Sequence, residues 1–127
     1  MASPFIAACV QHCAEDDVAR NIDEAVRLVR QAAGSGAALI CLPENFTCLE
    51  ERDALYLERG YAEADHPALS VFPALARELG VVLALGSLTI RLPSGRVHNR
   101  SYVLGADGAV LATYNKIHLF DVQLKQG

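Results

Sequence analysis

The sequence predicts an α/β protein in which a parallel sheet continues into an antiparallel ribbon. Three observations predict this class: an unbroken apolar run at residues 37–43, an amphipathic segment before it, and turn-rich segments in the last third of the chain. A continuous apolar run is typical of a strand that is buried on both faces, as in parallel sheets covered by helices. The turns indicate hairpins, which join antiparallel strands.

The first third of the chain has the pattern of a strand–helix–strand unit. Residues 5–11 have strand composition, and Asp16 or Asp17 can cap the following helix because a short acidic side chain accepts hydrogen bonds from first-turn amides. Gly34 and Gly36 should end that helix. One helical face is apolar and contains Val18, Ile22, Val26, Val29 and Ala33. The two strands are therefore expected to be parallel and joined by a right-handed crossover.

The remaining elements complete one domain over residues 1–127. An acidic loop is expected at residues 62–67, and no change in composition marks a linker. Turn residues at 93–95 and 105–108 separate the last strand-like segments, which should therefore form the antiparallel part of a mixed sheet. The expected elements are helices at residues 49–61 and 68–79, and strands at residues 81–90, 97–104 and 109–114.

Composition and charge restrict the function classes. The formal net charge of −4 comes without a basic cluster, so we expect neither nucleic acid nor a membrane as a partner. Residues 1–10 contain no Lys or Arg and lack the features of a signal peptide, so the four cysteines should be free thiols in a cytoplasmic protein. The Cys and His residues lack metal-ligand spacing, and no Gly-rich loop opens a helix, so no metal or cofactor is expected.

Glu44 and Lys116 are the candidate catalytic residues. Pro43 cannot donate a ladder hydrogen bond, which places Glu44 at the carboxyl end of a strand, where open α/β sheets form ligand crevices. Lys116 is the single charged residue of an apolar and aromatic segment, residues 114–120. A carboxylate and an amine that meet away from water suit general-base catalysis and oxyanion stabilisation. Taken singly, the Glu is more often a solvated loop residue and the Lys more often extends from an edge strand into water.

Two segments resemble motif blocks of the nitrilase (carbon–nitrogen hydrolase) superfamily: Leu42-Pro43-Glu44-Asn45-Phe46 and residues 114–121. The resemblance runs from residue 5 to the end of the chain and favours small-molecule amidases over nitrilases. It implies an αββα sandwich, with a mixed sheet and helices on one face, of which this chain resembles the N-terminal half. It also implies a homo-oligomer and a small-molecule amide or nitrile substrate.

The resemblance further implies a Glu–Lys–Cys triad. Glu44 would be the general base, Lys116 would stabilise the tetrahedral intermediate, and a cysteine would form a thioester acyl-enzyme. That cysteine follows the Lys block in the family, so it is expected beyond residue 127. We therefore expect the 127-residue chain alone to be inactive on amides and poorly soluble, because a sandwich divided here would expose an apolar sheet face.

None of the cysteines in this sequence is expected to replace that nucleophile. Cys41 should project to the face of the strand opposite Glu44. Cys48 has no cationic neighbour in the sequence that would lower the pKa of its thiol. Cys9 and Cys13 suit a buried packing residue and a loop thiol.

The alternative hypothesis is a non-catalytic α/β domain, either a small-molecule-binding module or a relic, that happens to carry an acid and a Lys. Its support is that 127 residues make a domain of ordinary size. The hydrolase hypothesis requires Glu44 and Lys116 to meet in a shared, water-poor cleft. Side chains on opposite sides of the molecule, or both free in solvent, would reject it.

Overall fold

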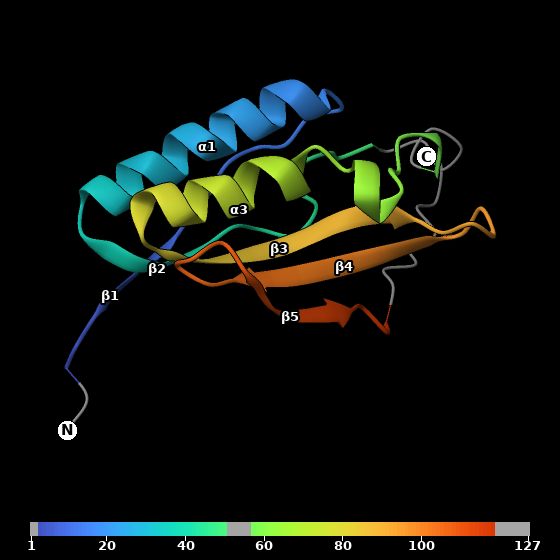
Figure 1. Cartoon of the computed structure of the whole chain (residues 1–127). Helices are drawn as coiled ribbons and strands as arrows, with labels where there is room; N and C mark the ends of the chain where they lie inside the picture. The colour runs from blue at the N-terminus through green and yellow to red at the C-terminus, as the bar shows by residue number, and fades with distance from the viewer. Residues whose placement is uncertain (1–2, 51–56, 119–127) are drawn as a thin grey trace.

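The computed structural model describes residues 3–50 and 57–118, which form a five-stranded sheet with two long helices on one of its faces (Figure 1). The strands lie in the order β1-β2-β3-β4-β5. They are β1 (Ile6–Cys9), β2 (Ala37–Cys41), β3 (Val82–Arg91), β4 (Val97–Leu104) and β5 (Val110–Asn115). The helices are α1 (Val18–Gly34), α3 (Ala68–Leu79) and the short 3-10 helix η1 (Glu63–Asp65).

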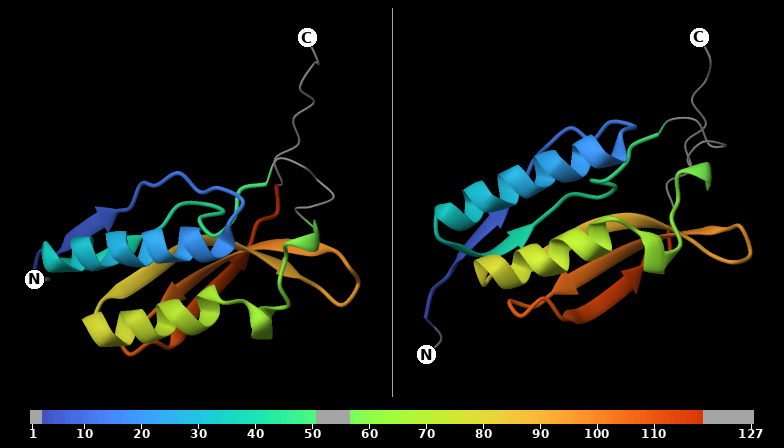
Figure 2. Two further views of the ribbon diagram at one scale, coloured as in Figure 1. Left: turned by 90° about the horizontal axis from the view of Figure 1, so that it is seen from above. Right: turned by 45° about the horizontal axis from the view of Figure 1, so that its top comes forward.

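The sheet is mixed, as expected from the sequence. β1 pairs with β2, and β2 with β3, in parallel, whereas β3 pairs with β4, and β4 with β5, in antiparallel fashion. α1 connects the first two strands, which confirms the predicted strand–helix–strand unit. Figure 2 shows α1 and α3 side by side over the same face of the sheet. None of the described helices is long and apolar enough to cross a membrane.

Local signals explain where the helices begin and end. The side chain of Asp17 accepts a hydrogen bond from the amide of Arg20 at 3.1 Å, which caps the first turn of α1. Gly80 adopts a φ of 66° directly after α3, a left-handed conformation that glycine adopts without steric cost. α3 therefore occupies the predicted residues 68–79 and ends where the sequence indicates.

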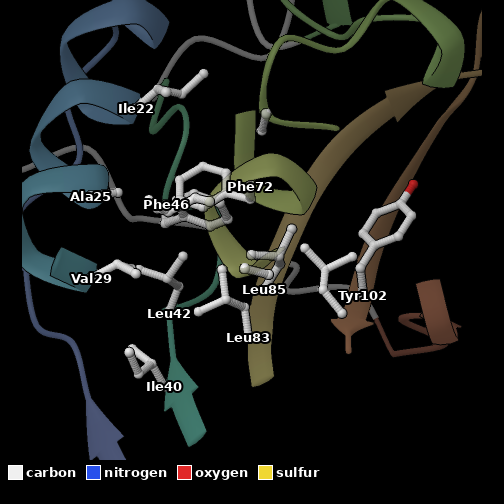
Figure 3. Close-up of a cluster of buried hydrophobic side chains, with 14 of the residues drawn as sticks. Ile22, Ala25, Val29, Ile40, Leu42, Phe46, Phe72, Leu83, Leu85 and Tyr102 are labelled. Atoms are coloured by element: carbon white, nitrogen blue, oxygen red, sulfur yellow. The ribbon is translucent and has the colours of Figure 1, made fainter. Parts of the chain in front are cut away.

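The core lies between the helices and the covered face of the sheet (Figure 3). α1 contributes Ile22, Ala25 and Val29, and the strands contribute residues such as Ile40, Leu83 and Leu85. Phe46, from the loop after β2, is fully buried and packs edge to face on Phe72 of α3, with ring centroids 5.2 Å apart. This aromatic contact anchors the loop that carries Glu44.

The structure differs from the sequence-based expectations at three places. β1 is shorter than residues 5–11 and its residues are largely exposed, so Cys9 is exposed and not a buried packing residue as expected. This is because β1 is an edge strand and no described helix covers its outer face. The acidic loop at residues 62–67 contains η1. The helix expected at residues 49–61 is wrong at both of its ends: residues 57–58 are helical, whereas residues 49–50 and 59–61 are not, and residues 51–56 lie outside the described residues.

His66, which follows η1, is a buried titratable group. Its side chain is 4% exposed, and its Nδ1 accepts a hydrogen bond from the amide of Ala68 in the first turn of α3, at 3.2 Å. Burial lowers the pKa of His66 to about 4. The folded protein therefore keeps the ring neutral, whereas the unfolded chain protonates it below a pH of about 6.5.

We expect the free energy of unfolding to fall as the pH drops from about 6.5 to about 4, by up to about 3 kcal/mol from His66 alone. The sign follows because the unfolded state binds more protons than the folded state throughout this interval. Urea unfolding across this pH range should show the loss in the wild type and a much flatter dependence in His66→Gln, which cannot be protonated. Identical pH dependences in the two proteins would contradict this assignment.

Candidate active site

Glu44 and Lys116 meet in the structure. Glu44 lies in the turn after β2, Lys116 follows β5, and the Lys116 Nζ donates a hydrogen bond to the Glu44 Oε1 at 2.7 Å. The two side chains are 51% and 32% exposed. The predicted contact is therefore present, but the described residues do not form the water-poor cleft that the sequence led us to expect.

A close backbone approach fixes where Glu44 leaves the sheet. The amide of Leu42 donates to the carbonyl of Ala84 at 2.8 Å, which extends the pairing of β2 with β3 up to Pro43. Opposite Pro43, a Cβ added to Gly86 would lie 2.2 Å from the Pro43 carbonyl oxygen, so only glycine fits. The register of β3 against β4 also shifts between Leu85 and Leu88, an irregularity of the kind common beside active sites.

The turn after Pro43 is held from the neighbouring strand. Asn45 adopts a φ of 52°, the left-handed region that Asn tolerates better than most residues. Its amide donates to the Oγ of Ser87, a residue of β3 that is 1% exposed, at 2.9 Å. Glu44 lies between Pro43, whose backbone packs against Gly86 of β3, and Phe46, whose side chain is buried in the core. Its carboxylate faces Lys116.

Asn99 on β4 contacts both candidate residues. Its side-chain Nδ2 donates to the Glu44 Oε1 at 2.9 Å and to the Asn45 Oδ1 at 3.4 Å. Its backbone carbonyl accepts a hydrogen bond from the amide of Lys116 at 2.9 Å. Reasoning from the sequence did not single out Asn99 or Ser87. The available signals were a Gly-Ser pair inside the apolar β3 segment and an Asn within a strand, where Asn is disfavoured.

A charged cluster next to this site joins η1 to β4 and β5. The guanidinium of Arg100 pairs with the Glu63 Oε1 at 2.7 Å and donates through Nε to the Asn115 Oδ1 at 2.7 Å. The Tyr102 hydroxyl donates to the same Glu63 oxygen at 2.6 Å. Hydrogen bonds from Tyr102 and Arg100 lower the pKa of Glu63, whereas burial raises the pKa of Tyr102. Because Asn115 precedes Lys116, this cluster secures the end of β5 at the site.

All four cysteines lie within the described residues and are free thiols. Among the described residues, no hydrogen bond joins a thiol to Glu44 or Lys116. Cys48 does gain a cationic neighbour, Arg59, that its sequence context does not offer, yet burial raises the pKa of its thiol more than Arg59 lowers it. Burial also raises the pKa of Cys41. Neither thiol therefore has the lowered pKa of an activated nucleophile.

No cluster of His, Cys, Asp and Glu residues that could hold a metal ion occurs within the described ranges. The carboxylate of Glu44 instead pairs with the ammonium of Lys116, and that of Glu63 with the guanidinium of Arg100. What the arrangement offers chemically is a carboxylate with a cation and an amide donor on one oxygen. Such a group can accept a proton while the adjacent ammonium stabilises a developing negative charge.

Relatives named as amidases match the chain over most of its length. It is 31% identical over 127 residues to a deaminated glutathione amidase of Synechocystis sp., covering 98% of this chain and 46% of the relative. It is 34% identical over 123 residues to an omega-amidase of Danio rerio, covering 96% of this chain and 43% of the relative. The chain thus spans less than half the length of these relatives.

Solved structures share the fold. The Caenorhabditis elegans NitFhit protein superposes with a TM-score of 0.81 at 27% identity, covering 93% of this chain and 29% of that one. A mutant amidase from Nesterenkonia sp. AN1 in complex with butyramide gives a TM-score of 0.78 at 27% identity, over 91% of this chain and 44% of that one. The sequence profile of carbon–nitrogen hydrolases matches residues 6–127. The chain therefore belongs to the carbon–nitrogen hydrolase family, within the nitrilase superfamily that its two motif segments resemble.

Proposed function

We propose that Glu44 and Lys116 are the acid and the lysine of an amidase that hydrolyses small, non-peptide amides through a thioester acyl-enzyme. The observation that carries the proposal is the 2.7 Å contact between the Lys116 Nζ and the Glu44 Oε1, made by residues that belong to distant segments of the chain. Family membership and relatives named as amidases support this chemistry and favour amides over nitriles.

In the proposed mechanism, Glu44 takes the proton of a cysteine thiol that lies outside residues 1–127. The thiolate attacks the amide carbon, and the Lys116 ammonium stabilises the oxyanion of the tetrahedral intermediate. Glu44 then returns the proton to the leaving nitrogen, so that ammonia departs and a thioester remains. Glu44 next deprotonates a water molecule, which attacks the thioester carbon; the C–S bond then breaks, the carboxylic acid departs, and Glu44 returns its proton to the cysteine sulfur.

The half-exposed state of the pair has a consequence for this proposal. A cation and a carboxylate attract each other far more weakly in water than in a dry site. The proposed enzyme therefore needs further residues that exclude water from Glu44 and Lys116. The inactivity of the 127-residue chain by itself, a cytoplasmic location and homo-oligomeric assembly stay predictions.

Ammonia release tests the function. We expect the full-length protein to release ammonia from butyramide faster than from butyronitrile, and to lose this activity after alkylation with N-ethylmaleimide, because the nucleophile is a thiol. Faster turnover of the nitrile would show that the protein is a nitrilase and not an amidase. A folded protein that releases ammonia from neither compound would favour the non-catalytic binding domain.

A further inference from the structure

We infer that Asn99 is a positioning residue that sets the orientation of the Glu44 carboxylate, so that Oε1 faces the lysine and Oε2 is left to accept a proton. This inference rests on the proposed function in that it assigns Glu44 the role of base. The geometry behind it is independent of that role. It comes from three hydrogen bonds made by one side chain and one backbone carbonyl of β4.

Two donors converge on a single oxygen of Glu44. The Lys116 Nζ lies 2.7 Å and the Asn99 Nδ2 lies 2.9 Å from Oε1. Across residues 3–50 and 57–118, no hydrogen bond reaches Oε2 of this carboxylate. A single donor would leave the carboxylate able to rotate about its terminal torsion, whereas two donors restrict that rotation. The proton-accepting position is thereby directed to Oε2, to which no described residue donates a hydrogen bond.

The amide of Asn99 is itself held in place. Its NH₂ group has two hydrogens, and its second acceptor is the Oδ1 of Asn45 at 3.4 Å. Asn45 is in turn tied by its amide to the buried hydroxyl of Ser87. Polar contacts that run from Ser87 on β3 through Asn45 in the turn therefore orient the side-chain amide of Asn99, which in turn orients Glu44.

The same residue also locates the lysine. The carbonyl of Asn99 accepts the amide hydrogen of Lys116 at 2.9 Å, which continues the pairing of β4 with β5 by one residue past Asn115. Asn99 therefore fixes the positions of both Glu44 and Lys116 relative to β4. Sites built on helices and strands are held more firmly than sites on loops. This backbone contact does not depend on the side chain, so substitutions at position 99 test the amide alone.

A purely structural role for the Asn99 side chain predicts that other substitutions at this position are tolerated. Asn is among the residues that strands disfavour, so a position that serves only the sheet would accept Leu without loss. It would also tolerate Asp, which has nearly the same shape and whose added charge matters only where the side chain contacts another carboxylate. A donor role predicts the reverse order, because Asp presents acceptors to the Glu44 Oε1 and the Asn45 Oδ1 and brings a second negative charge to the pair.

The kinetic test compares Asn99→Asp and Asn99→Leu in the full-length protein. We expect both to lower kcat for the amide by about 10- to 100-fold with KM nearly unchanged, and Asp to be at least as damaging as Leu. Val97→Ala is the matched control, since Val97 lies on the same face of β4 and its apolar side chain donates no hydrogen bond. Its kcat should equal that of the wild type. Wild-type kcat in Asn99→Asp would overturn the inference.

A spectroscopic test does not depend on activity. The side-chain amide signals of Asn99, assigned by their loss in Asn99→Leu, should shift in the ¹⁵N spectrum when Glu44 is replaced by Gln. They should stay in place in Glu78→Gln, which alters a carboxylate on α3. If the Asn99 amide signals had the same positions in Glu44→Gln as in the wild type, the inference would be wrong, even if the enzyme were active. Should the wild type hydrolyse no amide, the proposed function fails, while these spectra still decide whether Asn99 holds Glu44.

Discussion

Replacing Glu44 by Gln should lower kcat for amide hydrolysis by about 10²- to 10⁴-fold, which is the usual contribution of a positioned general base. Gln has nearly the same shape as Glu, and its side-chain oxygen can still accept the hydrogen bond that Lys116 donates at 2.7 Å. What the variant loses is the ability to take a proton from the nucleophile. Rates of ammonia release at saturating amide would show the loss.

The fold should survive this substitution. Both side chains of the pair are substantially exposed, and exposed ion pairs contribute only about 0–1 kcal/mol to stability. Glu78→Gln is a suitable control because Glu78 is exposed to a similar degree and pairs with Arg30 at 2.6 Å, on the helices. It should leave kcat unchanged and alter stability equally little. Full activity of Glu44→Gln would remove Glu44 from the proposed triad.

Gly86→Ala is expected to destabilise the protein by about 3–5 kcal/mol, an effect near the upper end for single substitutions. The added Cβ would lie 2.2 Å from the carbonyl oxygen of Pro43 and 2.3 Å from that of Leu42. These are backbone atoms, which cannot rotate away as a side chain can. β2 and β3 must separate at this point, which displaces the turn that carries Glu44.

Denaturant unfolding would measure the loss, with Gly34→Ala as the control. Gly34 ends α1, and a Cβ placed there meets nothing within 4 Å. That variant should be unchanged or more stable by up to about 1 kcal/mol, because Ala favours the helix. If the two Gly→Ala variants unfolded at the same denaturant concentration, close approach of β2 and β3 would not explain Gly86.

Much of the fold could be predicted because the signals that specify it are local. α3 and β4 occupy the predicted residues 68–79 and 97–104, since helical periodicity, a terminal glycine and turn residues act within a few positions of the chain. β1 was predicted too long because apolar composition does not tell an edge strand from a central one.

The site was predictable only in part. Glu44 and Lys116 could be singled out because a carboxylate after a buried strand and a lone ammonium in an aromatic segment contrast with their surroundings. Asn99 and Ser87 offered only a weak signal, since a short polar residue within a strand is unusual but does not reveal which distant group it contacts. Their importance emerges from the distances that separate them from Glu44 and Asn45.

By itself, the sequence determined the α/β class and the order of the elements and made Glu44 and Lys116 the candidates for the site, because capping, periodicity and turn chemistry depend on neighbouring residues. Only the tertiary structure decided that Lys116 and Asn99 share one oxygen of Glu44, that this pair stands half in solvent, and that Gly86 admits the backbone of Pro43. These features depend on how closely distant segments approach one another, and that distance is set by the packing of the whole sheet and its helices.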